Sequence, residues 1–322
     1  MYEVYYGLRE RPFDLTPDPR FLFLTPKHQE ALTTLEYGIS RRRGVTVVLG
    51  PAGTGKTTLI RAAMATLKAG SAQCVYINNP ALRRDEFVQT IAHAFQLNPE
   101  AAKSKATMLL ELERKLTERL AAGAITALII DEAQALSEEL LEEIRLLVNL
   151  ETETEKLLPV VLVGQLEFAE RLAQPSCAAL KQRIALRCQL LPLSASETAH
   201  YVATRLRTAG GSPAQSFTRE AIHLIHQCSS GIPRTINVIC DNALLSGFAA
   251  GQRPVSQQLI RDVCRDYDFD TPSSFEEPGA RPAADRPLKP EPLQAVKEQP
   301  GQHDDRKLFG TFGRPTRSWF NR

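Results

Sequence analysis

The stretch VVLGPAGTGKTTLIRAAM, Val47–Met64, decides the fold of this chain. It contains the pattern Gly-x-x-x-x-Gly-Lys-Thr, between a β-branched apolar run and a helical pattern. The glycines let the backbone turn so tightly that several N–H groups can point at one phosphate chain, and the positive end of the following helix adds to that field. The strand-then-helix context therefore predicts a nucleotide-binding phosphate loop rather than a glycine-rich turn without a ligand.

Side chains of this loop are expected to bind both the nucleotide and a metal ion. Lys56 supplies a charge to the β- and γ-phosphates, and the Thr57 hydroxyl is placed to bind Mg²⁺. The predicted nucleotide contacts are Gly50, Pro51, Ala52, Gly53, Thr54, Gly55, Lys56, Thr57 and Thr58. This pattern alone leaves open whether the phosphate is transferred, hydrolysed or only sensed.

A second motif, LIIDEAQ, favours hydrolysis. Asp131 follows an apolar strand-like run and is expected to hold the Mg²⁺ shell together with Thr57. Glu132 comes next, where a carboxylate can polarise a water for attack on the γ-phosphate. An enzyme that transfers the phosphate to a small molecule must exclude that water. The alternative for Glu132 is a charge that marks the entry to a helix.

Strand-like runs alternate with helical patterns through the first two thirds of the chain. This alternation predicts an α/β fold, with a parallel five-stranded sheet covered by helices on both faces. The expected strands are 44–50, 72–80, 124–134, 157–165 and 185–193, and the expected helices are about 27–42, 56–68, 84–97, 104–122, 137–151 and 167–174.

Strand signals end after Leu193, where four helical patterns predict a small lid. Ser194 and Glu197 form a capping box at its start. From Asp270 onward the composition is polar and rich in proline, which predicts a disordered tail. The predicted parts are an N-terminal segment with its lead-in helix (1–43), the nucleotide-binding core (44–193), the helical lid (194–269) and the tail (270–322).

Four further polar residues are candidates for the γ-phosphate. Gln165 ends the fourth expected strand, which in many phosphate-loop hydrolases lies between the loop strand and the aspartate strand. Arg183 and Arg187 lie just before and within the fifth strand, and Arg234 begins a lid helix after a Gly-x-Pro turn. Solvated surface arginines are the alternative, above all for Arg187.

Bulk properties exclude several other classes of protein. The 322 residues have a formal net charge of +2, which gives no overall attraction to nucleic acid or to an anionic membrane. A signal peptide and an apolar run of membrane-spanning length are both absent from the sequence, so a cytoplasmic location is expected. The six cysteines and the pair His223 and His226 lack metal-ligand spacing, and we expect buried thiols and an ordinary helix surface.

In combination, the motifs GPAGTGKTT, LIIDEAQ, LVGQ, LKQRI and GIPRTIN resemble those of an AAA+ ATPase. The opening YYGLRERPFDLTPDPRFLFLTPKHQEAL and the segment LEEIRLLVNLETETEKLLPVVLVGQ resemble, more narrowly, one group of AAA+ proteins. This group comprises the general secretion pathway protein A (ExeA-type) ATPases and the related ATPases found with exosortase and exopolysaccharide loci. The similarity covers about residues 1–268.

The resemblance implies ATP and Mg²⁺ as cofactors and a homo-oligomer in which an arginine of one subunit completes the site of its neighbour. Arg183 resembles that arginine finger, Gln165 the first sensor and Arg234 the second. The resemblance also places the segment RPF…PRFLFL near the adenine. It further implies assembly or energising of an envelope secretion or exopolysaccharide export system, with that system's proteins as partners. The location would be the cytoplasm or the periphery of the inner membrane.

Two features depart from the family pattern. A polar tail stands where such secretion ATPases often continue into a membrane helix and a peptidoglycan-binding domain, and GQLE replaces the usual Gly-Gln-Pro turn after the fourth strand. Two other functions stay open. One is a DNA-bound helper ATPase of the transposition type, to which the net charge of +2 gives little support. The other is a nucleotide-gated scaffold that binds ATP and hydrolyses it negligibly.

Overall fold

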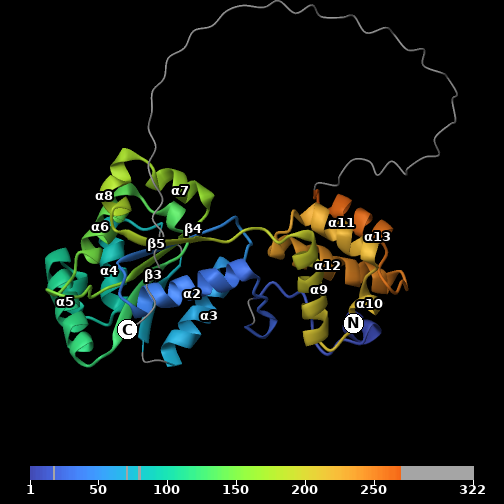
Figure 1. The fold of residues 1–322 in the computed structure, drawn as a ribbon, viewed down its shortest axis with the longest axis horizontal. Helices are drawn as coiled ribbons and strands as arrows, with labels where there is room; N and C mark the ends of the chain where they lie inside the picture. The colour runs from blue at the N-terminus through green and yellow to red at the C-terminus, as the bar shows by residue number, and fades with distance from the viewer. Residues whose placement is uncertain (17–18, 70–71, 79–80, 270–322) are drawn as a thin grey trace, which may run out of the picture. The chain divides into compact units, whose positions relative to one another are not determined.

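The predicted parallel sheet is present in the computed structural model, which describes residues 1–16, 19–69, 72–78 and 81–269 (Figure 1). Its strands lie in the order β2-β3-β4-β1-β5 and all pair in parallel. They are β1 (Val45–Leu49), β2 (Ala72–Ile77), β3 (Ile125–Ile130), β4 (Val160–Gly164) and β5 (Ile184–Gln189). The predicted disordered tail lies outside the described residues.

The strand order brings three of the predicted motifs to one edge of the sheet. Strand β4 lies between β1 and β3, as expected from the position of Gln165, and Leu49 at the end of β1 pairs with Gly164 at the end of β4. Because the strands are parallel, the phosphate loop, Asp131 and Gln165 all follow carboxyl ends of neighbouring strands.

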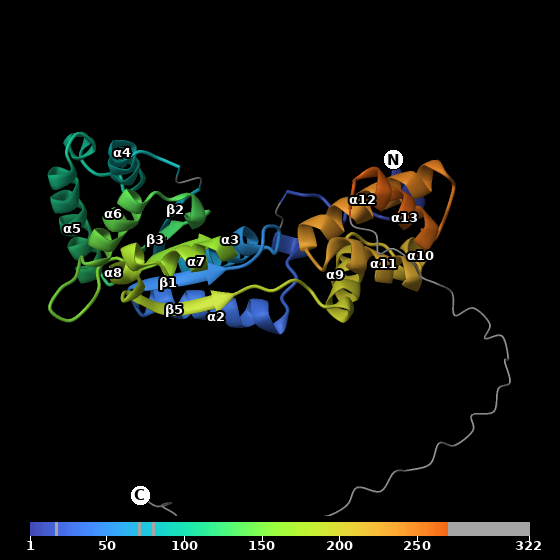
Figure 2. The same ribbon diagram turned by 90° about the horizontal axis from the view of Figure 1, so that it is seen from above.

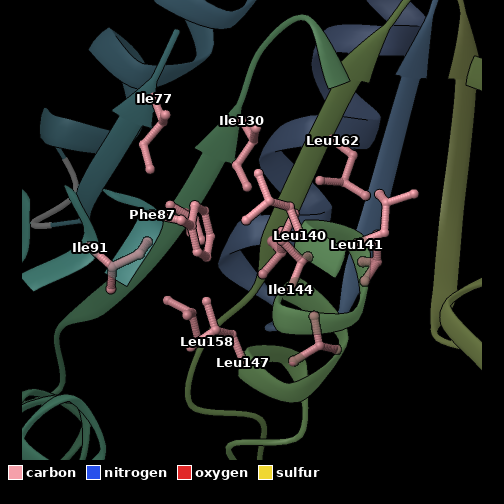
Figure 3. Packing of buried hydrophobic residues seen from close by; sticks show 14 of the residues in the cluster. Ile77, Phe87, Ile91, Ile130, Leu140, Leu141, Ile144, Leu147, Leu158 and Leu162 are labelled. Carbon is pink, nitrogen blue, oxygen red and sulfur yellow. The ribbon is translucent and has the colours of Figure 1, made fainter. Parts of the chain in front are cut away.

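Helices cover both faces of the sheet, as the alternating pattern predicts (Figures 1 and 2). One face is packed by α2 (Pro26–Ser40) and α3 (Lys56–Ala69), and the other by α4 (Arg84–Ala94), α5 (Lys105–Ala121) and α6 (Glu138–Val148). Figure 3 shows the second core, where Phe87 of α4 and Ile144 of α6 pack near Ile130 and Leu162 of the sheet. Successive strand residues alternate between the two cores, because strand side chains point to opposite faces in turn.

The lid contains the predicted helices, α9 (Ala195–Thr208), α11 (Arg219–Ser229), α12 (Pro233–Ala249) and α13 (Gln257–Asp266). The predicted capping box is present, since Ser194 Oγ accepts from the N–H of Glu197 at 3.3 Å and Glu197 Oε2 accepts from the N–H of Ser194 at 2.8 Å. The helix expected at 167–174 is present as α7 (Leu166–Leu172), which begins one residue earlier. The structure adds short elements that periodicity did not indicate: α1 (Tyr2–Tyr6), α8 (Ala178–Lys181), α10 (Pro213–Ser216), and the 3-10 turns η1 (Pro19–Phe21), η2 (Pro99–Ala102), η3 (Ala133–Ala135) and η4 (Pro175–Cys177).

The packing divides the predicted N-terminal part, 1–43, between two hydrophobic cores. Tyr2, Tyr6, Phe13 and Phe21 are buried in one cluster with the lid helices, whereas α2 packs on the sheet. The chain before α2 is therefore attached to the lid by the same hydrophobic contacts that hold the lid helices together.

All five strands are shorter than the sequence pattern indicated, and three of them end three or four residues early. The first is β3, which ends at Ile130 rather than at residue 134, because Glu132 adopts the left-handed conformation (φ 54°) and ends the extended run. The second is β5, which ends at Gln189 rather than at residue 193, and the third is β2, which ends at Ile77.

The cysteines are buried or half-buried thiols, as expected from the sequence. All six are free thiols; Cys74 is half-buried and the other five are buried. Burial raises the pKa of Cys188 to about 11, so its thiol stays protonated near neutral pH. Among the described residues, neither a membrane-spanning helix nor a cluster of three or more His, Cys, Asp or Glu side chains suited to a metal is found.

Candidate nucleotide-binding site

A cavity of about 480 Å³ lies beside the phosphate loop. Its lining includes loop residues 52–58 and three residues of the predicted catalytic set, Glu132, Gln165 and Arg234. The N-terminal part, the lid and the residue just before the lid supply further walls: Asp14, Leu15, Thr16, Phe21, Leu22, Phe23, His28, Leu193, Tyr201, Arg205, Pro233 and Asn237. The predicted catalytic arginine Arg183 does not line this cavity, nor does Arg187.

The phosphate loop has the backbone that its glycines predict. Gly53 (φ 79°) and Gly55 (φ 93°) occupy the left-handed region. Lys56 is buried, and its Nζ donates to the carbonyl oxygens of Gly50 at 2.8 Å and Pro51 at 2.9 Å. Burial lowers the pKa of Lys56, while the carboxylates of Glu132 and Asp131 act in the opposite direction.

A buried ammonium in this position fits an anionic ligand. In the part of the chain that the structure describes, Lys56 forms no ion pair closer than 4.0 Å, although it is only 6% exposed. A buried cation without a carboxylate partner is costly, and a bound phosphate would supply the missing charge. The cavity therefore fits a nucleoside triphosphate at its phosphate end.

Oxygen atoms at the end of β3 fit a magnesium ion. Asp131 is 1% exposed, and its Oδ2 accepts from Thr57 Oγ1 at 2.8 Å, so the two predicted metal-binding residues are in direct contact. Its Oδ1 accepts from the N–H of Glu132 at 2.9 Å. Carboxylate and hydroxyl oxygens are ligands that Mg²⁺ prefers.

Tyr76 is a neighbour of Asp131 that no sequence motif marks. It lies on β2, and its hydroxyl donates to Asp131 Oδ2 at 2.8 Å. Burial and this hydrogen bond raise the pKa of Tyr76. The hydroxyl therefore stays protonated and helps to orient the carboxylate.

Glu132 and Gln165 approach each other at the cavity wall. Gln165 Nε2 donates to Glu132 Oε2 at 3.4 Å, and Gln134 Nε2 donates to the same oxygen. The left-handed backbone at Glu132 is uncommon for a residue other than glycine. These contacts keep the carboxylate at the cavity, where a water beside a bound phosphate would be within its reach.

Arg234 reaches the phosphate loop through the start of a lid helix. Pro233 is the first residue of α12, and the N–H of Arg234 donates to the carbonyl of Gly53 at 3.2 Å. The two backbones lie so close that a Cβ at Gly53 would be 2.8 Å from the Arg234 Cβ. The turn before the helix needs Gly231, which has φ 71° and would place a Cβ 2.0 Å from the carbonyl oxygen of Leu193.

His28 connects helix α2 to the phosphate loop. Its Nδ1 is hydrogen-bonded to Thr25 Oγ1 at 2.7 Å, and its Nε2 to the carbonyl oxygen of Thr54 at 3.2 Å. In the sequence, the N-cap pattern Thr25-Pro26 marks the start of the helix and says nothing about the loop. Burial lowers the pKa of His28, so the folded protein holds the imidazole neutral.

This burial predicts a loss of stability on acidification. A histidine whose pKa is lower in the folded than in the unfolded chain contributes stability above the unfolded value of about 6.5, and that stability is lost as the pH falls toward the folded value. We expect the melting temperature of His28→Asn to fall less steeply than that of wild type between about pH 7 and pH 5. The exposed His93, replaced by asparagine, is the control and should keep the wild-type slope. Equal slopes for all three proteins would contradict this role of His28.

Arg205 attaches the N-terminal segment to the lid. From α9, its Nε donates to the carbonyl oxygen of Pro12 and its Nη2 to that of Asp14 at 3.4 Å. Its guanidinium lies 4.9 Å from the centre of the Phe21 ring. Phe21 lines the cavity, in keeping with the expected position of this segment near the base, which stays a prediction.

Arg183 and Arg187 lie away from the cavity. Both are exposed, and the carbonyl of Arg183 accepts from the N–H of Val45 at the start of β1. The phosphate loop begins after the other end of that strand, about 15 Å further along at about 3.3 Å per residue. An arginine in this position can reach a phosphate only if the phosphate is bound to another subunit.

The comparisons with known proteins agree with this fold. Residues 39–172 match the family of AAA domains. Cdc6p from Pyrobaculum aerophilum superposes with a TM-score of 0.62 at 19% identity, over 79% of this chain and 70% of that chain. The ORC2 protein of Aeropyrum pernix superposes with a TM-score of 0.60 at 19% identity, over 80% of this chain and 71% of that chain. Similarity at these identities shows a shared fold.

A curated relative is similar in sequence as well. General secretion pathway protein A of Aeromonas hydrophila is 41% identical over 256 residues, which make up 79% of this chain and 46% of that protein. The chain thus spans about half the length of this relative. Together with the phosphate loop and the sheet order, these similarities place the chain among the AAA+ ATPases of the general secretion pathway protein A type.

Proposed function

We propose that this protein binds ATP with Mg²⁺ in the cavity and hydrolyses it to ADP and phosphate. The observation that carries the proposal is the meeting of the phosphate loop, Glu132, Gln165 and Arg234 at one cavity. The loop N–H groups and Lys56 hold the β- and γ-phosphates, while Thr57 and Asp131 hold the metal. When bound, Mg²⁺ neutralises charge on the phosphate oxygens.

Glu132 is proposed to accept the proton of the attacking water. Its carboxylate lines the cavity, where it can accept a proton from a water beside the γ-phosphate. The Gln165 amide, hydrogen-bonded to Glu132, would orient the same water or bind the γ-phosphate. Arg234 would add positive charge from the lid, which links lid position to the presence of the terminal phosphate.

The remaining charge is proposed to come from Arg183 of a neighbouring subunit. Exposure of Arg183 and its distance from the cavity of its own chain support an assembly in which each site is completed in trans. Such an interface is head-to-tail and closes into a ring when the rotation between subunits allows it.

We propose that the energy of hydrolysis drives assembly or operation of an envelope secretion or exopolysaccharide export system. The support is the printed name of the relative, general secretion pathway protein A, which this chain matches over 46% of that protein's length. The partners would be protein components of that system, met in the cytoplasm or at the inner membrane. Affinity purification of the tagged chain from its own cells should enrich such components, and enrichment of transposition proteins instead would contradict this role.

A concentration series tests hydrolysis and assembly together. We expect phosphate release per mole of protein to rise with protein concentration and then level off, because a site completed in trans is active only in the assembled form. Lys56→Ala, measured at the same concentrations, should release no phosphate above background. Wild-type release no higher than that of Lys56→Ala would favour a scaffold, and release independent of concentration would exclude completion in trans.

A further inference from the structure

Gln134 makes a set of contacts that its place in the sequence does not reveal. It lies two residues after Glu132, in η3. The nitrogen and the oxygen of its side-chain amide are hydrogen-bonded to different partners. Nε2 donates to Glu132 Oε2, and Oε1 accepts from the backbone N–H of Gln165 at 3.1 Å. One side chain thus joins the proposed base to Gln165, the residue just before α7.

The rest of Gln134 is fixed as well. Its backbone carbonyl accepts from Arg171 Nη1 of α7 at 2.7 Å. The end of β4 also approaches the amide closely, since a Cβ at Gly164 would lie 3.2 Å from Gln134 Oε1. A side-chain amide that is hydrogen-bonded through both of its polar atoms, in a residue whose backbone is also hydrogen-bonded, has little freedom to rotate. The groups hydrogen-bonded to it therefore keep a fixed orientation.

The carboxylate that Gln134 contacts needs such support. Glu132 has a left-handed backbone, a conformation that persists in a residue other than glycine when surrounding contacts over-determine it. Two amide donors, from Gln134 and Gln165, meet at one oxygen of this carboxylate. Its other oxygen, Oε1, is not part of this contact and remains for the water.

We propose that Gln134 is a positioning residue that directs the Glu132 carboxylate toward the attacking water and connects it to Gln165. This inference rests on the proposed hydrolysis. Gln134 does not line the cavity, so it acts through Glu132 rather than on the nucleotide. These hydrogen bonds fix the orientation of the Glu132 carboxylate relative to Gln165.

Two substitutions separate this role from support of the fold. Gln134→Met keeps the length of the side chain and removes both hydrogen bonds, whereas Gln134→Glu keeps an acceptor for the N–H of Gln165 and removes the donor to Glu132. We expect both variants to lower kcat by about 10- to 100-fold, with the KM for ATP nearly unchanged. If Gln134 only braces the start of α7, Gln134→Met lowers the melting temperature and leaves kcat at the wild-type value, and the proposal is wrong.

A double-mutant cycle gives the second readout. In a Glu132→Gln background, Gln134→Met should cause no further fall in kcat, because the group through which it acts is already absent. An equal fall in both backgrounds would overturn the proposal. The control is Gln258→Met, at an exposed position of α13 far along the chain, which should match wild type. Melting temperatures of all variants confirm that they fold.

The same measurements distinguish failure of this inference from failure of the proposed function. If wild type releases no more phosphate than Lys56→Ala, both the proposed function and the role of Gln134 are wrong. If wild type hydrolyses ATP and Gln134→Met has the same kcat, only the role of Gln134 is wrong.

Discussion

Replacement of Arg183 by alanine is expected to lower ATP turnover by about 10³-fold or more, without loss of ATP binding. The side chain is exposed, and Arg183 lies at the amino end of β5, whereas the phosphate loop follows the carboxyl end of the neighbouring strand β1. Arg183 therefore cannot assist the site of its own chain. In an assembly it would stabilise the charge that develops on the γ-phosphate of the neighbouring subunit. The measurement is phosphate release at saturating ATP, at a protein concentration where wild type is fully active, together with ATP affinity.

Arg187→Ala is the matched control for this result. Arg187 is also an exposed arginine, four residues further along in β5, and should keep near-wild-type turnover. If Arg187→Ala loses turnover while Arg183→Ala turns over ATP like wild type, Arg187 rather than Arg183 is the arginine finger. Full activity of both variants would exclude an arginine finger from this strand.

Glu132→Gln is expected to lower turnover by about 10²- to 10⁴-fold while ATP still binds. The substitution keeps the size of the side chain and a hydrogen-bonding group near Gln165, and it removes the ability to accept a proton from water. Phosphate release and ATP affinity, measured on the same preparation, separate the chemical step from binding. Turnover equal to that of wild type would exclude Glu132 as the base, and lost ATP binding would assign it a binding role.

Mixing the two inactive variants tests whether the site is shared. Subunits carrying Arg183→Ala keep Glu132, and subunits carrying Glu132→Gln keep Arg183, so a site between one of each is complete. With random mixing and independent sites, half of the subunits keep Glu132 and half of their neighbours keep Arg183, which gives about a quarter of wild-type turnover. No recovery in the mixture, under conditions where wild type assembles, would place both residues in a single chain.

Local sequence patterns predicted most of the fold and the phosphate end of the site. The alternation of strands and helices, the glycines of the phosphate loop and the doublet Asp131-Glu132 each report on backbone geometry within a few residues. The capping box at Ser194 is a local signal of the same kind, and the structure confirms it. The ends of the strands were predicted less accurately than their existence. The apolar pattern of β3 continues in the sequence beyond the point where the backbone turns at Glu132.

The amino-acid sequence by itself determined the parallel α/β fold, the helical lid and the position of the phosphate loop, because periodicity and glycine content act over short distances along the chain. Only the tertiary structure decided that His28 contacts the loop, that Tyr76 holds Asp131 and that the segment before α2 belongs to the lid. Tyr76 and Asp131 are 55 residues apart, and Arg205 and Pro12 are 193 apart. Contacts at such separations depend on how strands order in the sheet and how helices pack, and single-sequence patterns carry no direct record of either.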